Sequence, residues 1–424
     1  MNILIKNAFA VLPEGNIENC SVCIKDGMIS SINEEPQDFT ADKIIDATYK
    51  LLIPGFINAH THVHMTALRN RADDLMFMTW LFDKVMPMED KLTAEDAYWS
   101  IQLACMEMLE SGITTFLDMH MFPDTVVRAT LDAGLRAVIS RGFQGGKDDL
   151  ENGHRRIREA KADIEKYNGI PTISFMLAPH APYTCDEGYL TEIAALADDM
   201  GLGIHTHLSE SLDEQNTIMQ RYGMTPAEYY DKYGILRNNT VCAHCVYLSE
   251  SDMELLAKRG TSVAHNSASN MKLGNGFADV PSMIKHGINV CIGTDSAASN
   301  NNLSILREMQ LVSLIHKGTN QSATTVSASE VFDMATVNGA KALGIYDKTG
   351  EIAVGKSADL TLFDMNSVGF FPIGDPKAAL SYSSAGLKAD TVMVNGQILL
   401  EKGEFKTIDK ERVIHEISKL IKRF

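Results

Sequence analysis

The sequence predicts an α/β protein built on a (β/α)8 barrel of the TIM type, with a small composite β domain formed by the N- and C-terminal segments. Eight short apolar stretches rich in β-branched residues recur through the middle of the chain, and they end in polar residues. Longer amphipathic segments separate them, so that each strand is followed by a helix. The length of 424 residues allows a large core with a satellite domain. Eight strands alternating with helices favour a closed parallel barrel over an open sheet.

Strands and helix starts can be placed along this middle region. Thr93 is the expected N-cap of a helix that runs to Ser111, with Asp96 in the reciprocal position of the cap. Capping boxes at Ser251–Glu254 and Ser327–Glu330 are expected to open two further helices. The eight barrel strands are expected at 53–62, 113–120, 136–143, 172–180, 203–210, 240–245, 261–270 and 289–299.

The two chain ends are typical of short strands joined by tight turns. Asp26-Gly27 and Asn395-Gly396 each predict a hairpin. Neither end carries enough strands to be stable alone, so we expect them to pair in one domain. A C-terminal helix is expected from Lys410 to Arg423. The predicted division is a composite β-sandwich domain of residues 1–52 plus 350–424 beside a (β/α)8 barrel of residues 53–349.

Charge argues against two classes of function. Lysine and arginine number 38, and aspartate and glutamate number 55, so that the formal net charge is −17. A surface this acidic repels phosphate backbones and anionic lipid headgroups, so we expect neither a nucleic-acid partner nor a membrane partner. No apolar run approaches the roughly 20 residues that span a bilayer. The first residues, Met1–Phe9, lack the apolar region of a signal peptide, and we therefore expect a cytoplasmic protein.

The seven cysteines are expected to be reduced thiols, because their number is odd and the chain shows no secretory signal. Two pairs, Cys20/Cys23 and Cys242/Cys245, have the C-x-x-C spacing of a four-cysteine zinc site or a redox motif. Both pairs lie in strand-like runs, where positions i and i+3 face opposite sides. Buried packing thiols are therefore the favoured interpretation.

Histidines gather at the ends of the predicted strands. In barrels of this type the catalytic groups come from the carboxyl ends of the strands. A single histidine is more often a core or surface residue, but several at the ends of successive strands of one barrel indicate a site. Nine of the 13 histidines lie in or just after a predicted strand: His60, His62, His64, His120, His180, His205, His207, His244 and His265.

Four residues at strand ends suit one divalent metal. His60 and His62 stand two apart on one strand, so that both imidazoles can point to the barrel interior. His207 on the fifth strand supplies a third nitrogen, and Asp295 on the eighth supplies an oxygen. Such a set suits Zn²⁺ or Fe²⁺ with a position left for water, whose pKa the metal lowers to about 7. A two-metal site of this kind commonly uses a modified lysine on the fourth strand, and 172–182 contains none, so one metal is expected.

Two further residues are placed for proton transfer. Glu210 lies three residues after His207, where it can reach a bound substrate without ligating the metal. It is a candidate to take a proton from the nucleophilic water and to give it to the substrate. A solvated loop carboxylate is the alternative, against which the adjacent metal site argues. His244, ending the sixth strand, is placed to orient the attacking water beside Asp295.

Seven stretches carry a resemblance to known proteins, and they are PGFINAHTHVHMTALR (54–69), WLFDKVMPMED (80–90), APHAPYTC (178–185), HLSE (207–210), AHCVYL (243–248), HNSASNMKLGNG (265–276) and GTDSAASNNN (293–302). In these motifs and their order, the chain resembles the amidohydrolase superfamily. More narrowly, it is similar to the 5-methylthioadenosine/S-adenosylhomocysteine deaminase group. The resemblance covers essentially the whole chain, including the β domain.

The resemblance implies a hydrolytic deaminase of adenine nucleosides that converts S-adenosylhomocysteine, 5′-methylthioadenosine or adenosine into the inosine analogue and ammonia. A metal-bound hydroxide would attack C6 while Glu210 protonates N1, and His244 and Asp295 would handle the water proton. No organic cofactor is implied. One divalent metal per subunit, Zn²⁺ or alternatively Fe²⁺, would bind His60, His62, His207 and Asp295. The implied substrate contacts are Glu89 with the ribose hydroxyls, Arg141, His180, Glu210 and Asp295.

Five positions keep more than one interpretation. His64 stands where the family often has a small or apolar residue, and a structural or substrate-side role is favoured over ligation. His205 is expected behind the metal site or in the core, and His265 is expected near the site. Arg155 or Arg156 is a candidate to meet an amino-acid carboxylate on the substrate, and a solvated helix start is the alternative for each.

Three other functions compete with the deaminase. A deaminase of a free base or pterin would have no use for a ribose contact at Glu89. A triazine-type hydrolase of the same superfamily is a near alternative, although Glu210 argues for a leaving group that needs proton transfer. A non-catalytic metal-binding or scaffold protein would be expected to have lost a ligand or the shuttle carboxylate, and none is missing. The sequence shows no subunit interface, so a homo-oligomer stays open.

Overall fold

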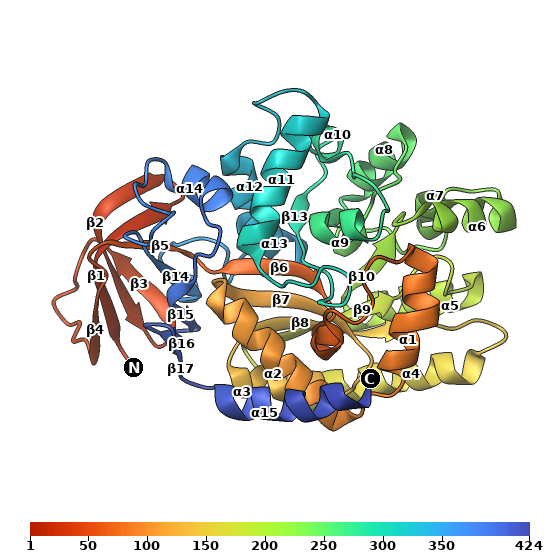
Figure 1. The fold of residues 1–424 in the computed structure, drawn as a ribbon, viewed down its shortest axis with the longest axis horizontal. Coiled ribbons are helices and arrows are strands. Elements are labelled where there is room, and N and C mark those ends of the chain that lie inside the picture. The colour runs from red at the N-terminus through yellow and green to blue at the C-terminus, as the bar shows by residue number, and fades with distance from the viewer.

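The computed structural model describes residues 1–424, and eight parallel strands form a nearly closed barrel (Figure 1). The order is β13-β12-β11-β10-β9-β8-β7-β6, with β13 beside β6. The strands are almost continuously buried, as expected when a sheet is covered on both faces. All eight predicted strands are confirmed, as β6 (Phe56–Thr61), β7 (Ile113–His120), β8 (Arg136–Phe143), β9 (Ile173–Pro179), β10 (Gly203–Leu208), β11 (Thr240–His244), β12 (Ser262–His265) and β13 (Val290–Ile292).

The junction between the last and first strands is closed tightly. The backbone N–H of Asp295 donates to the carbonyl oxygen of His60 at 2.9 Å. Asn58 holds the backbone N–H of Thr294 at 2.9 Å and donates to its hydroxyl at 2.7 Å. A Cβ on Gly293 would lie 2.8 Å from the Cβ of His60, so glycine is required for this approach. The segment that carries Asp295 is thereby fixed against the strand that carries His60.

Helices cover the outside of the barrel, because parallel strands need a crossover between them (Figure 1). Short helical turns follow β6 and lead into the first covering helix, and they are η1 (Val63–Leu68), η2 (Thr79–Val85) and α1 (Met86–Glu89). The covering helices are α2 (Ala94–Glu110), α3 (Thr125–Ala133), α4 (Leu150–Tyr167), α5 (Glu187–Met200), α6 (Leu212–Tyr222), α7 (Pro226–Lys232), α8 (Glu250–Arg259), α9 (Ser267–Lys272), α10 (Val280–Lys285), α11 (Ile305–Thr319), α12 (Ala328–Ala335) and α13 (Val337–Ala342).

Two of the three predicted helix starts are confirmed. Thr93 caps α2 in a capping box with Asp96, and Ser327 caps α12 in the same way. The capping box expected at Ser251–Glu254 is wrong, because α8 begins two residues earlier, with Ser249 as the cap and Asp252 as its partner. Two overlapping signals compete in this stretch, and the one at Ser249 satisfies the free N–H groups at the start of the helix.

A second, mixed sheet is built from both ends of the chain and stands beside the barrel (Figure 1). The antiparallel pair β5–β14 joins the N-terminal strands to the C-terminal ones. Both predicted hairpin turns are present, with positive φ at Asp26-Gly27 and at Asn395-Gly396. The strands are β1 (Ile3–Leu12), β2 (Gly15–Lys25), β3 (Met28–Ile32), β4 (Lys43–Asp46), β5 (Lys50–Pro54), β14 (Leu360–Asp364), β15 (Ala389–Val394), β16 (Gln397–Glu401) and β17 (Glu404–Phe405).

The C-terminal segment also reaches back over the barrel. Helix α15 (Lys410–Leu420), followed by the turn η3 (Ile421–Arg423), packs against α2, and α14 (Pro376–Tyr382) packs against α11 and α12. We retain residues 1–52 plus 350–424 and residues 53–349 as a proposed division of the chain.

All seven cysteines are buried free thiols. Cys20 and Cys23 lie in β2 of the mixed sheet, whereas Cys242 lies in β11 of the barrel and Cys245 directly after it. The two C-x-x-C pairs therefore do not form one four-cysteine site. No helix combines the length and the apolar composition that a bilayer-spanning segment needs.

Candidate metal centre and active site

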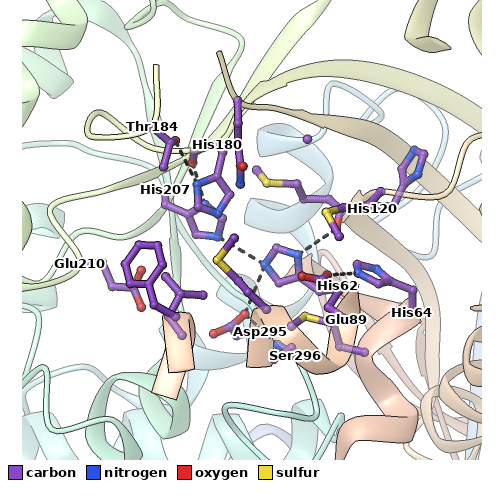
Figure 2. Close-up of a pocket in the computed structure, with 18 of the residues that line it drawn as sticks. His62, His64, Glu89, His120, His180, Thr184, His207, Glu210, Asp295 and Ser296 are labelled. Carbon is purple, nitrogen blue, oxygen red and sulfur yellow. Dashed lines mark hydrogen bonds and ion pairs between the residues drawn. The ribbon is translucent and has the colours of Figure 1, made fainter. Parts of the chain in front are cut away.

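Strand ends of the barrel bring the predicted metal ligands together (Figure 2). Nε2 of His62 lies 3.3 Å from Nε2 of His207 and 3.5 Å from Oδ1 of Asp295. Nε2 of His60 lies 3.4 Å from the same aspartate oxygen. Two overlapping sets of potential ligand atoms, each within 4.8 Å, share His60, and they are His60, His62 and His207 on one side and His60, His244 and Asp295 on the other.

The hydrogen bonds of the histidine Nδ1 atoms determine whether Nε2 presents a lone pair or a proton to this site. Nδ1 of His62 donates to the carbonyl oxygen of Met119 at 2.8 Å, and Nδ1 of His207 donates to that of His180 at 2.7 Å. A carbonyl oxygen only accepts, so the proton of each neutral ring is on Nδ1 and the lone pair is on Nε2. Two lone pairs thus face each other across 3.3 Å with no proton between them.

The tautomer of His60 follows from a longer chain of hydrogen bonds. The hydroxyl of Ser140 donates its one proton to the carbonyl oxygen of Asp118 at 2.6 Å, so it accepts from Nδ1 of His205 at 2.9 Å. Nε2 of His205 is then an acceptor and receives Nδ1–H of His60 at 2.8 Å. Nε2 of His60 is left as a buried lone pair without a hydrogen-bond partner.

These donors fit a divalent metal ion. Burial lowers the pKa of His60 to about 3 and holds the pKa of His207 well below its usual range, so both rings are neutral and able to coordinate. Three nitrogen lone pairs and one carboxylate converge with no proton to separate them, and a cation would relieve that repulsion. Outer partners on the ligand histidines are the usual support of a metal site.

The backbone is strained where the strands deliver these groups. Ser209, His244 and Asp295 have φ values of 51°, 75° and 60°, in the left-handed region that non-glycine residues rarely adopt. Such conformations persist where the surroundings determine them, and they cluster at functional sites. For Asp295, the fixing contacts include the hydroxyls of Ser269 and Ser299, which donate to Oδ2 at 2.5 and 2.7 Å.

Glu210 lies beside the candidate metal centre without belonging to either set of potential ligand atoms. Its Oε2 is 3.8 Å from Nε2 of His244, and its Oε1 accepts a hydrogen bond from Asn275 at 3.3 Å. Burial, reinforced by the negative charge of Asp295, holds the pKa of Glu210 well above its ordinary value. The environment therefore favours the protonated form of this carboxyl group, which can give a proton to a ligand in the cavity.

His244 is oriented toward the same region. Its Nδ1 pairs with Oδ1 of Asn270 at 2.8 Å, an acceptor, so Nδ1 carries the proton and Nε2 is the free lone pair. This nitrogen belongs to the ligand-atom set with Asp295. His244 can therefore accept a proton from a water molecule held between these side chains.

One cavity joins eight of the nine predicted site residues, and His60 lies buried behind it. Figure 2 shows His62, His207, Asp295 and Glu210 facing the same space as His180 and Glu89. Burial lowers the pKa of His180 to about 4, and its Nδ1 contacts the hydroxyl of Thr184 at 3.1 Å. Much of the apolar lining comes from the segment after η1, and these residues are Phe77, Trp80, Leu81, Phe82 and Met86.

Of the arginines proposed from the sequence as substrate contacts, Arg141 and Arg156 line the cavity and Arg155 does not. Arg141 lines the cavity, with Nε bonded to Glu159 at 3.0 Å. Arg156, in α4, also lines the cavity and donates to the carbonyl oxygen of Gln144, whereas Arg155 is half-exposed and pairs with Glu159. Two guanidinium groups therefore line the cavity, and each has a carboxylate beside it, Glu159 at Arg141 and Asp149, 3.3 Å away, at Arg156.

The histidines left open by the sequence fall in three places. His205 supports His60 from behind, as described above. His265 bonds Ser267 at 2.8 Å and lies 3.3 Å from His316, and it does not line the cavity. His64 lines the cavity and turns its Nε2 to Glu89 at 2.5 Å rather than to the ligand cluster.

Sequence reasoning missed the residues that hold the site from outside. Glu214 accepts the backbone N–H groups of Ser209 and Glu210, yet its only sequence signal is a capping pattern with Ser211. Ser269 and Asn270 lie within a motif of the resemblance, but no role had been assigned to them. Ser140 had no signal, because its contact with His205 joins two strands that are 65 residues apart.

Comparison with known proteins agrees with this geometry. A family model described as "Amidohydrolase family" matches residues 51–399. The 5-methylthioadenosine/S-adenosylhomocysteine deaminase of Acetivibrio thermocellus is 44% identical over 430 residues, which cover 100% of this chain and 99% of that protein. The 5′-deoxyadenosine deaminase of Methanothermobacter thermautotrophicus is 42% identical over 406 residues, covering 95% of this chain and 94% of that protein.

Two solved structures with bound zinc share the fold. An adenosine deaminase from Xanthomonas campestris superimposes with a TM-score of 0.94 at 29% identity, covering 99% of this chain and 98% of that one. An atrazine chlorohydrolase from Arthrobacter aurescens, complexed with zinc, gives a TM-score of 0.92 at 25% identity over 99% of this chain and 100% of that one. The match over most of the chain, together with the full-length relatives, shows that this protein belongs to the amidohydrolase family.

Proposed function

We propose that this protein is a metal-dependent deaminase of adenine nucleosides, acting on S-adenosylhomocysteine, 5′-methylthioadenosine or adenosine and releasing ammonia and the inosine analogue. The observation that carries the proposal is the position of Glu210, a buried carboxyl group with a raised pKa, beside a converging set of potential metal-ligand atoms. The full-length relatives named as deaminases of 5-methylthioadenosine/S-adenosylhomocysteine and of 5′-deoxyadenosine support the same substrate class.

The site is proposed to hold one divalent metal, with His60, His62, His207 and Asp295 as ligands. We favour Zn²⁺, with Fe²⁺ as the alternative, because both accept this donor set and zinc is bound in two similar structures. A single metal is favoured because β9 offers no lysine or carboxylate. When bound, such a metal lowers the pKa of its water to about 7 and makes hydroxide available at neutral pH.

The residues around the site then divide the proton transfers. Carbon C6 of an aminopurine is a poor electrophile until the neighbouring N1 is protonated, and the neutral carboxyl group of Glu210 can supply that proton. His244 and Asp295 are placed to accept the proton of the attacking water. The carboxylate of Glu210 can then take up the proton of the new C6 hydroxyl and pass it to the amino group, so that ammonia leaves and the purine carbonyl forms. The water proton held by His244 and Asp295 finally returns to Glu210 and restores its acid form.

The rest of the cavity is proposed to bind the nucleoside. Glu89 is assigned to the ribose hydroxyls, because a carboxylate accepts from both members of a diol. His180 and Arg141 contact the substrate from the other side of the cavity. The aromatic and methionine side chains of 77–86 offer apolar surface for the substrate and exclude water from the reacting groups.

The test is a turnover screen of the metal-loaded protein. Ammonia release is measured with adenosine, 5′-methylthioadenosine, S-adenosylhomocysteine, guanine and cytosine, and chloride release is measured with a chlorotriazine. Turnover of at least one adenine nucleoside is expected, and its absence with all three would refute the substrate assignment. Glu210→Gln is expected to lower turnover at least about 1,000-fold while the bound metal stays near one per subunit. Turnover that survives this change would refute the role of Glu210.

A further inference from the structure

His64 and Glu89 form a buried pair at the rim of the metal site (Figure 2). Nε2 of His64 donates to Oε1 of Glu89 at 2.5 Å, and the side chains are 1% and 11% exposed. The other carboxylate oxygen, Oε2, has no hydrogen-bond partner in the protein, although Glu89 lines the cavity. One oxygen is therefore held by the protein while the other is free to meet a ligand.

The two residues come from segments of different character. His64 belongs to η1, directly after β6, where the backbone N–H of Val63 donates to Asp118 at 2.8 Å. Its ring packs against Phe122 with centroids 5.5 Å apart. Glu89 is the last residue of the short helix α1, which no barrel strand precedes directly. His64 is therefore positioned by a barrel strand, whereas Glu89 ends a four-residue helix. The hydrogen bond from His64 fixes the orientation of the Glu89 carboxylate.

We propose that His64 is a positioning residue that presents the Glu89 carboxylate to the vicinal diol of a ribose and so sets the preference of the cavity for ribonucleosides. This inference rests on the proposed contact of Glu89 with the ribose. Without the bond from His64, the buried carboxylate would have to turn for a new partner, and the binding of a diol would carry the cost of reorienting it.

The test compares the binding of inosine and 2′,3′-dideoxyinosine, which share the base and the 5′ group and differ in the diol. Binding is measured by calorimetry on metal-loaded protein, and metal content is checked because His64 is two residues from a proposed ligand. The wild type is expected to prefer inosine by at least about 10-fold, the effect of one hydrogen bond to a charged group. His64→Ala should remove most of that preference and leave the affinity for the dideoxy compound within about twofold.

Three companion variants make the result specific. His64→Gln, whose amide can still donate to Glu89, should restore part of the preference. Glu89→Gln combined with His64→Ala should lose no more preference than Glu89→Gln alone, since both changes act on one contact. His120→Ala is the matched control: His120 is a buried, cavity-lining histidine whose Nδ1 has no partner, and its loss should change both affinities by the same factor.

Two results of the binding experiment would overturn the positioning role of His64. Equal weakening of both ligands by His64→Ala would overturn the proposal and leave a purely structural role. A wild type without preference for inosine would overturn the proposal as well, because no diol contact would exist to position. The deaminase assignment is judged separately by ammonia release, so a protein that binds the diol through His64 and Glu89 but turns over no adenine nucleoside would refute the proposed reaction alone.

Discussion

The carboxylate of Glu214 accepts the backbone N–H of Glu210 at 2.9 Å, and its other oxygen accepts that of Ser209 at 2.8 Å. The turn that presents the acid is thereby held from behind, although Ser209 has the strained φ of 51°. Glu214→Gln replaces one acceptor with an NH₂ group that faces a backbone N–H. We expect kcat to fall roughly 10- to 100-fold with little change in KM, because the shuttle would be misplaced by a fraction of an ångström.

This prediction is checked by steady-state kinetics on the best nucleoside, together with metal analysis. Glu228→Gln is the matched control, because Glu228 is also the third helical residue of a capped helix, α7, but accepts from the backbone N–H of Thr225, which does not line the cavity. Its kcat should stay within about twofold of the wild-type value. An unchanged kcat in Glu214→Gln would contradict a positioning role for Glu214.

The hydrogen bonds that link Ser140 to His205 and His205 to His60 are expected to affect metal affinity. Ser140→Ala removes the acceptor that fixes the tautomer of His205, so His60 would no longer be held with its Nε2 lone pair facing the centre. A weakening of metal binding by about 10-fold is expected from loss of such an outer partner. Competition with a chromogenic chelator measures it. Thr115→Val, which deletes a buried hydroxyl without a hydrogen-bond partner, should leave the affinity unchanged.

A buried ion pair joins the barrel to the mixed sheet. Arg136, at the start of β8, bonds Asp359, which precedes β14, at 2.7 and 3.2 Å, and the two side chains are 4% and 0% exposed. Arg136→Met would leave the buried carboxylate of Asp359 without its positively charged partner, so we expect the free energy of unfolding to drop by about 3 kcal/mol. Urea unfolding followed by circular dichroism measures the change. The double variant with Asp359→Asn should recover part of the loss, and a drop below about 1 kcal/mol in the single variant would contradict the assignment.

The buried carboxyl group of Glu308 is expected to make the folding stability of the protein depend on pH. Burial raises its pKa to about 7, and its carboxylate accepts from the backbone N–H of Ala268 and from Asn300. A raised pKa means that the folded state binds the proton more tightly than the unfolded state does. The stability that Glu308 contributes is therefore present below its unfolded pKa near 4.5 and is lost as the pH rises through about 7.

Glu308→Gln removes this titration, so the difference in free energy of unfolding between the wild type and the variant reports the contribution of Glu308. Between pH 5 and pH 8.5 we expect the stability of the wild type to fall relative to Glu308→Gln by about 2 kcal/mol. Thermal unfolding of both metal-loaded proteins across this range measures the difference. A constant difference between the two melting temperatures would show that Glu308 does not titrate in this window.

The convergence of the proposed metal ligands could be predicted from the sequence because of a property of parallel barrels. Residues at the carboxyl ends of successive strands meet at one rim whatever their separation along the chain. His60, His207 and Asp295 are far apart in the sequence, and each follows an apolar strand whose position the local pattern indicates. Two histidines at i and i+2 on such a strand face the same side.

The supporting contacts could not be predicted in this way. The hydrogen bond between His64 and Glu89 links a turn after β6 to the end of a short helix, and no local period connects them. The start of α8 was missed for a related reason. Ser249 and Ser251 each open a capping pattern in the sequence, and the path of the loop from β11 selects the first.

The amino-acid sequence alone therefore determined the strand order of the barrel, the pairing of its two ends in a second sheet and the identity of the groups that converge at the rim, because these depend on periodicity and on polar residues at strand ends. Only the tertiary structure decided the tautomers of the histidines, the upward shift in the pKa of Glu210 and the orientation of Glu89. Those properties depend on burial and on hydrogen-bond partners from distant segments, which three-dimensional packing alone brings within reach.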